Sequence, residues 1–99
     1  KQRNEHHHVK LKNILYVYRD NATEKTVVVT IESEYAIRET LSSIADKLDF
    51  RFVQTHRACF VNMDKIENVD FKNNIIYLNN DSSIDYLSRN YKKKLREIL

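Results

Sequence analysis

Short runs of apolar and β-branched residues dominate the first third of the chain and predict strands. Residues 26–31 read Thr-Val-Val-Val-Thr-Ile, a composition that disfavours a helix and favours a buried strand. In residues 9–18 the alternation of apolar and polar positions breaks between Leu11 and Ile14, so two short strands or one bulged strand are expected there. The polar segment 19–25 is then predicted to be the loop of a hairpin.

A helical period appears twice along the chain. The apolar residues of the middle segment recur at intervals of three and four, and they are Ile37, Leu41, Ile44, Ala45 and Leu48. This spacing predicts an amphipathic helix with one buried stripe. Its other face lacks the basic side chains of a recognition helix, so we interpret it as a structural brace. A second stripe in residues 88–99 predicts a C-terminal helix that is capped by Ser88 and begins at Arg89.

The stretch between the two helical patterns again predicts strands. Apolar residues at 50–53 lead into a strand that is expected to continue in Cys59-Phe60-Val61 after a polar interruption. Asn73-Asn74 separates two apolar runs and predicts a tight hairpin with left-handed backbone at its centre. A turn at 79–82 and a last strand at 83–87 follow. The expected fold is mostly β, with short antiparallel strands in small sheets, one bracing helix and a basic C-terminal helix.

Composition narrows the class of protein. The 99 residues allow one domain with a single core. Glycine and proline are both absent, so turns with positive φ must use Asn or Asp. The lone cysteine, Cys59, excludes an intramolecular disulfide, and its apolar neighbours predict a small buried hydrophobe. No apolar run approaches the ~20 residues of a membrane span, and we expect a cytoplasmic protein.

The chain is expected to divide into a polar linker or tail at residues 1–8 and a globular domain at residues 9–99. The tail contains His6, His7 and His8, which lack the partners of a metal site, so no metal is predicted. Catalysis is also not expected, because the chain shows no paired acids on one face, no oriented nucleophile and no glycine-rich phosphate loop. No cofactor is predicted.

Charge points to a polyanionic partner. The net charge is +3, and the segment 85–99 holds five basic residues against two acids. Such clustering creates a local field that attracts phosphate groups. The tyrosines could stack on bases, but their strand and helix spacing makes core positions the better interpretation.

Two motifs resemble those of a known family. Residues 52–66 read Phe-Val-x-Thr-His-Arg-x-x-Phe-Val-Asn-x-x-x-Ile, and residues 88–95 read Ser-Arg-x-Tyr-x-x-x-Leu. In this order the motifs resemble the LytTR-type DNA-binding domain of bacterial response regulators, over roughly residues 13–99. The resemblance implies an elongated β fold that binds double-stranded DNA through loops between strands. It also implies a transcription regulator that contains a receiver domain and binds paired direct repeats as a dimer.

The resemblance, together with side-chain chemistry, selects candidate contacts. A guanidinium can donate two bonds to guanine in the major groove, and an amide or ammonium can also reach base edges. The candidates for base contacts are Arg57, Arg89, Asn21 and Lys25. The candidates for phosphate contacts are His56, Arg19, Asn90, Lys92 and Lys93. His56 could instead hold its loop through the backbone, and Asn62 is expected to hold a turn through its side chain.

Two other functions are compatible with a basic surface. The first alternative is a protein-interaction module that docks an acidic partner. RNA binding is a weaker alternative, because sequence-specific RNA readers usually expose stacking aromatics. Preference for one DNA sequence over its shuffled version separates these functions.

Overall fold

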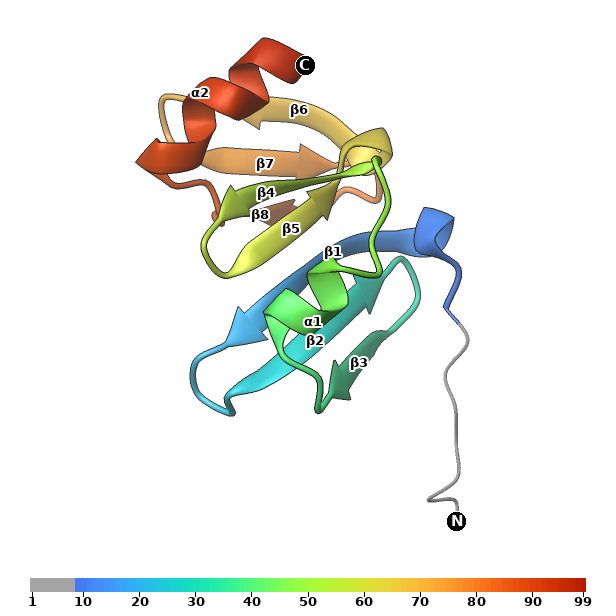
Figure 1. Ribbon diagram of the computed structural model, residues 1–99. Coiled ribbons are helices and arrows are strands. Elements are labelled where there is room, and N and C mark those ends of the chain that lie inside the picture. The colour runs from blue at the N-terminus through green and yellow to red at the C-terminus, as the bar shows by residue number, and fades with distance from the viewer. Residues whose placement is uncertain (1–8) are drawn as a thin grey trace.

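The computed structural model describes residues 9–99 and confirms the mostly β fold (Figure 1). Two antiparallel sheets form, a five-stranded sheet in the order β3-β2-β1-β5-β4 and a three-stranded sheet in the order β6-β7-β8. The strands are β1 (Ile14–Asp20), β2 (Lys25–Thr30), β3 (Glu34–Ile37), β4 (Phe52–His56), β5 (Cys59–Asn62), β6 (Ile66–Asp70), β7 (Ile75–Leu78) and β8 (Ser83–Ile84). The helices are α1 (Leu41–Ala45) and α2 (Arg89–Ile98), with 3-10 turns at Leu11–Asn13 and Met63–Lys65. The domain is elongated and measures 46 × 23 × 23 Å.

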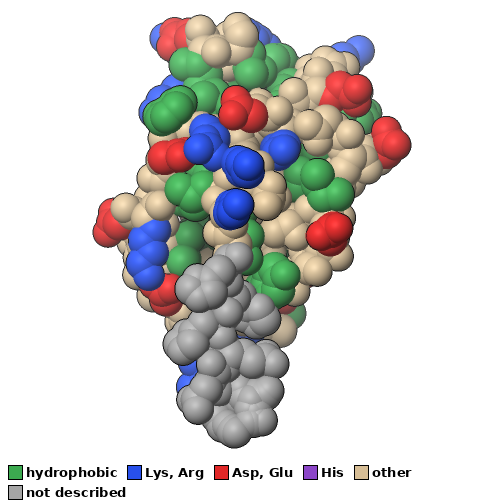
Figure 2. Space-filling view, turned by 90° about the vertical axis from the view of Figure 1, so that its right-hand side faces the viewer, with side chains coloured by type: hydrophobic (Ala, Val, Ile, Leu, Met, Phe, Trp, Pro, Cys, Tyr) green, Lys and Arg blue, Asp and Glu red, His purple; other side chains and the backbone are tan. Residues whose placement is uncertain are grey.

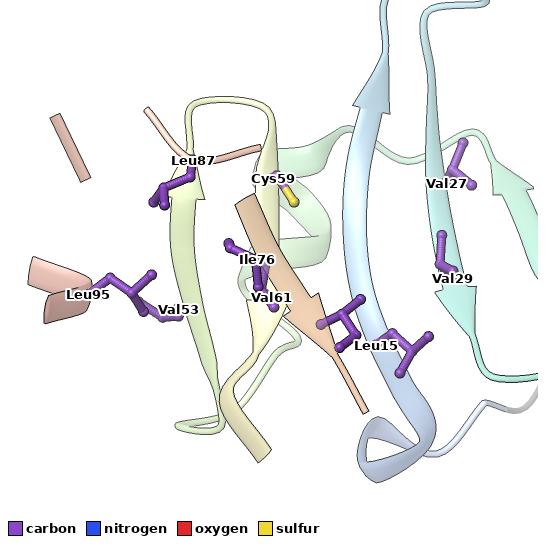
Figure 3. Packing of buried hydrophobic residues seen from close by; sticks show 10 residues of the cluster. Leu15, Val27, Val29, Val53, Cys59, Val61, Ile76, Leu87 and Leu95 are labelled. Atoms are coloured by element: carbon purple, nitrogen blue, oxygen red, sulfur yellow. The ribbon is translucent and has the colours of Figure 1, made fainter. Parts of the chain in front are cut away.

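The main core lies between the two sheets and is closed by α2. Its fully buried members come from both sheets and from the helix, and they include Leu15, Val61, Ile76, Leu78 and Leu95. Figure 3 shows Ile76 of β7 against Val61 of β5, and Leu95 of α2 against Val53 of β4. The contact between α2 and β4 therefore joins the end of the chain to its central motif.

A second, smaller core lies on the opposite face of the five-stranded sheet, under α1. Ile14, Val17, Val28 and Ile44 form it. The pairing of β1 with β2 shifts between Ile14 and Tyr16, and this bulge turns Leu15 and Tyr16 toward the main core together. The irregularity expected in this segment is thus a bulged strand that follows a 3-10 turn.

The middle helix is much shorter than predicted. Only residues 41–45 are helical, and Ile37 belongs to β3, where it pairs with Thr26. The helix begins at Leu41 because the Thr40 hydroxyl accepts a hydrogen bond from the Ser43 amide at 3.1 Å. The apolar residues still share one core, since Ile37, Leu41 and Leu48 pack with Ile44. The helical spacing identified the residues that are buried together but not the element that carries each one.

The central motif is a hairpin, not the single interrupted strand that was predicted. β4 and β5 pair antiparallel with Val53 opposite Val61, and Arg57 and Ala58 form the turn. Phe50 lies outside the strand and is 86% exposed in a turn closed by a bond from the Phe52 amide to the Asp49 carbonyl. The predicted last strand is also shorter, because β8 ends at Ile84.

Turn chemistry follows the expectation in two of three places. Asn74 and Asp81 adopt φ of 60° and 68°, as expected for a chain without glycine. Glu24 has φ of 59°, which no pattern indicated. α2 begins at Arg89 as predicted, but the Ser88 side chain makes no capping bond, and the Tyr91 amide instead donates to the Ser88 carbonyl. Among residues 9–99 no helix is long and apolar enough to cross a membrane.

Candidate nucleic-acid interface

The predicted contact residues come from three segments that lie at one edge of the molecule. The segments are the tip of the β1–β2 hairpin, the turn between β4 and β5, and the approach to α2. Antiparallel pairing of β1, β5 and β4 brings the end of β1 beside the β4–β5 turn, and all three segments lie along the left side of Figure 1. The positions predicted to contact DNA thus share one side of the domain.

Two backbone hydrogen bonds fasten these segments to one another. The Arg19 amide donates to the Ala58 carbonyl at 2.9 Å, which joins β1 to the β4–β5 turn. The Ser88 amide donates to the Thr55 carbonyl at 3.0 Å, which joins the start of α2 to β4. These bonds use only backbone groups, so the side chains of Arg57 and Arg89 take no part in them. Both residues are nevertheless held in place by their neighbours in the chain.

The carboxylate of Asp20 orders the tip of the β1–β2 hairpin. Its two oxygens accept from the Ala22 amide at 3.1 Å and from the Thr23 hydroxyl at 3.0 Å. The candidates Asn21 and Lys25 are exposed and have no side-chain partner among residues 9–99. A tip that is ordered by its own aspartate can present both side chains to a ligand without reorganising.

His56 holds the central turn through its ring. Its Nδ1 accepts a hydrogen bond from the Ala58 amide at 3.0 Å, so the structural role considered for this residue is confirmed, although the partner is an amide and not a carbonyl. A ring that accepts at Nδ1 and is neutral carries its proton at Nε2. The Nε2–H group is therefore a donor, and a phosphate contact from it stays a prediction. Arg57, the next residue, is exposed.

The α2 candidates divide into exposed side chains and one that is bonded within the domain. Arg89, Asn90 and Lys93 are exposed. Lys92 is half-buried, and its Nζ donates to the Phe71 carbonyl at 2.8 Å. One turn further, the Arg96 guanidinium lies 4.6 Å from the centre of the Phe71 ring. Two cations of the basic cluster thus dock α2 on the β6–β7 hairpin, a use that sequence reasoning missed because nothing near them in the chain indicates Phe71.

Asn62 and Cys59 are structural, as predicted. The buried Asn62 side chain donates to the Ile14 carbonyl at 2.9 Å and accepts from the Asp64 amide at 3.0 Å, so it holds the turn after β5 and also ties that turn to β1. Cys59 is fully buried, and burial raises the pKa of its thiol to about 12. The thiol is therefore not a nucleophile at neutral pH. Within residues 9–99 no group of acids, histidines and cysteines could hold a metal, and His6, His7 and His8 lie outside the described residues.

Basic side chains also gather at the end remote from these segments. Figure 2 faces that end and shows Lys and Arg side chains in the middle of the surface with acids around them. Lys10 and Lys12 precede β1 there, Arg51 precedes β4, and Lys65 follows β5. Arg51 is paired with Asp49 at 3.3 Å. Charge alone therefore does not locate the interface, and the candidates from the two sequence motifs, Arg57 and Arg89, lie at the opposite edge.

The described residues thus form a mostly β domain that carries basic and amide side chains at two turns and on the first turns of its C-terminal helix. The model of the LytTr DNA-binding domain family matches residues 4–99, and the chain belongs to this family. The family binds DNA to regulate transcription and is non-catalytic.

The fold has a close structural counterpart. The structure of the LytTr DNA-binding domain from a Bacillus cereus protein, described as a methyl-accepting/DNA response regulator, superimposes with a TM-score of 0.82. The match covers 99% of this chain and 91% of the other at 20% sequence identity, so it shows the fold alone. No curated protein is similar enough in sequence to count as a match.

Proposed function

We propose that the chain is the output domain of a two-component response regulator and binds a specific sequence of double-stranded DNA. The observation that carries this proposal is a set of exposed side chains at one edge that have no side-chain partner among residues 9–99. Arg57, Arg89, Asn21 and Lys25 come from three segments that are tied by backbone bonds. Guanidinium and amide groups on a rigid frame suit base edges in the major groove.

The phosphate contacts are assigned to the residues that flank these four. Arg19 and His56 are half-buried at the edge, and Asn90 and Lys93 are exposed on the first turn and a half of α2. Lys92 keeps its place among the candidates, because an ammonium has three donors and Phe71 uses one. Such contacts place the domain on the duplex and strengthen binding without selecting sequence.

Two copies on paired direct repeats are the proposed regulatory arrangement. Direct repeats orient both domains the same way, so any contact between them joins two different surfaces, unlike the self-complementary contact of a two-fold dimer. A receiver domain in the same protein would control this pairing. The support for that context is the family and the response-regulator description of the Bacillus cereus relative.

The test is selection from a random pool of DNA duplexes, followed by fluorescence-anisotropy titration of the winning sequence and its shuffled version at two salt concentrations. We expect a repeated motif to be enriched and to bind at least about 10³-fold more tightly than its shuffle. Absence of enrichment together with salt-sensitive binding to both duplexes would favour the alternative, a protein-interaction module with a basic surface.

A further inference from the structure

One aromatic ring from each interface segment joins a common cluster. Tyr18 lies in β1, His56 ends β4, and Tyr86 lies in the segment that leads to α2. The ring centroids of Tyr18 and Tyr86 are 5.4 Å apart with their planes tilted by 30°. Those of His56 and Tyr86 are also 5.4 Å apart, in an edge-to-face arrangement. Tyr86 is therefore the central ring and contacts the other two.

Each ring is close in sequence to a proposed DNA contact. Tyr18 precedes Arg19, His56 precedes Arg57, and Tyr86 lies three residues before Arg89. The pairing of β1 with β5 fixes the first two segments relative to each other, whereas one backbone bond, from Ser88 to Thr55, joins the approach to α2 to β4. Contacts of Tyr86 with both other rings add a third constraint, which fixes the approach to α2 against β1 and β4 together.

We propose that Tyr86 is a positioning residue for DNA binding, whose ring sets the placement of Arg57 and Arg89 relative to each other. The inference rests on the proposed function and extends it, because Tyr86 carries no charge and belongs to neither of the two motifs. Bidentate base contacts require side chains to be held to within about 0.5 Å, and long Arg side chains achieve this only on a rigid base. The two arginines then contact the DNA as one unit.

The ring, and not the hydroxyl, performs this function. Among residues 9–99 the Tyr86 hydroxyl has no hydrogen-bond partner, whereas its ring has two aromatic neighbours. The ring also packs on the main core as a partly buried residue. Phenylalanine therefore preserves every contact that carries the proposal, and leucine removes the aromatic contacts while keeping an apolar side chain.

The test compares Tyr86→Leu, Tyr86→Phe and the control Tyr77→Leu for binding to the selected duplex and to its shuffle. Tyr77 is a partly exposed tyrosine of β7 outside the cluster. We expect Tyr86→Leu to lose about tenfold or more in affinity for the selected duplex and to change less than about twofold on the shuffle. Tyr86→Phe and Tyr77→Leu should match the parent protein on both duplexes.

A spectroscopic signature separates positioning from general destabilisation. In the parent protein the Ala58 amide donates to His56, and loss of the Tyr86 ring should shift the Ala58 amide and His56 ring resonances, while those of Ile76 in the core stay in place. Unchanged affinity of Tyr86→Leu, or equal losses on both duplexes, would overturn the proposal. A loss in Tyr86→Phe would also overturn it, because the hydroxyl would then touch DNA.

Two further outcomes remain decisive. If Tyr86→Leu does not fold, Tyr18→Leu removes one of the two ring contacts of Tyr86 and should reduce affinity for the selected duplex alone; no reduction would refute the proposal. If the parent protein itself shows no sequence preference, the proposed function fails, and that failure is visible before any variant is made.

Discussion

At the residue scale, Arg57 has two properties that a base-reading side chain needs. It is exposed at the tip of a turn, and the residues on both sides of it are held, His56 through its ring and Ala58 through its amide and its carbonyl. We predict that Arg57→Ala costs about 1–3 kcal/mol of binding free energy on the selected duplex and much less on its shuffle. Anisotropy titrations of both duplexes measure the difference.

The matched control for Arg57 is Lys12→Ala, which removes the same charge at the end remote from the interface. Arg57→Lys keeps the charge but not the two parallel donors, so it should resemble Arg57→Ala on the selected duplex. If Arg57→Lys binds like the parent protein, only the charge matters, and Arg57 contacts a phosphate instead of a base.

Asn62 is the residue whose loss should damage the fold itself. Its buried amide group satisfies the carbonyl of Ile14, which is also buried. We predict that Asn62→Ala lowers the free energy of unfolding by about 1–3 kcal/mol, because a buried carbonyl is left without a donor. Urea denaturation measures this value. Asn62→Asp should cost more, since it buries a charge and still lacks the donor, and equal stability of all three proteins would contradict the assignment.

At the scale of elements, the basic helix α2 has two kinds of lysine. Lys92 is bonded to the Phe71 carbonyl, and Lys93 is exposed. We predict that Lys92→Met reduces stability by up to about 1.5 kcal/mol, since it removes a charge-assisted bond in a partly exposed place. Lys93→Met should leave stability unchanged and make the slope of log K against log salt shallower by about 0.9, the value for one phosphate. Identical effects of the two changes on stability would contradict this division.

The elements also show how far the sequence determines the fold. β2 was predictable because its β-branched residues are buried on both faces, and the β6–β7 hairpin because Asn74 can adopt positive φ. The middle helix was overestimated because Ile37 in β3 and Leu41 in α1 serve the same core at helical spacing. The β4–β5 turn was missed because a His56 ring closes it, where the usual signals are Gly or Asn.

The sequence indicated candidate contact residues, whose contact with DNA stays a prediction, but it did not indicate the contacts that support their segments. The motifs placed Arg57 and Arg89, and the structure puts their segments at one edge. The supports are contacts between residues far apart in the chain, such as Lys92 with Phe71 and Tyr18 with Tyr86. Local patterns carry no information about such pairs, since either member satisfies its own spacing as an ordinary strand or helix residue.

At the scale of the whole molecule, a buried thiol and a half-buried phenol should make stability depend on alkaline pH. Burial raises the pKa of the Cys59 thiol from 9.0 to about 12, and burial, with Glu34 nearby, raises the pKa of the Tyr16 hydroxyl from 10.0 to about 12. Both groups are neutral when folded and ionise more easily when unfolded. Their contribution to stability is therefore complete below pH 9 and is lost as pH rises from 9 toward 12.

Urea denaturation at stepwise higher pH tests this expectation with Cys59→Ala as the comparison. The variant removes the group that begins to ionise first, so its stability should fall less steeply between pH 9 and 10 than that of the parent protein, whatever the absolute cost of the substitution. The remaining fall above pH 10 comes from Tyr16, together with Tyr18 and Tyr86, whose pKa values burial also raises, and it should persist. Equal slopes over the first interval would mean that the thiol is already ionised or accessible, and would place Cys59 outside the main core to which the packing of β5 assigns it.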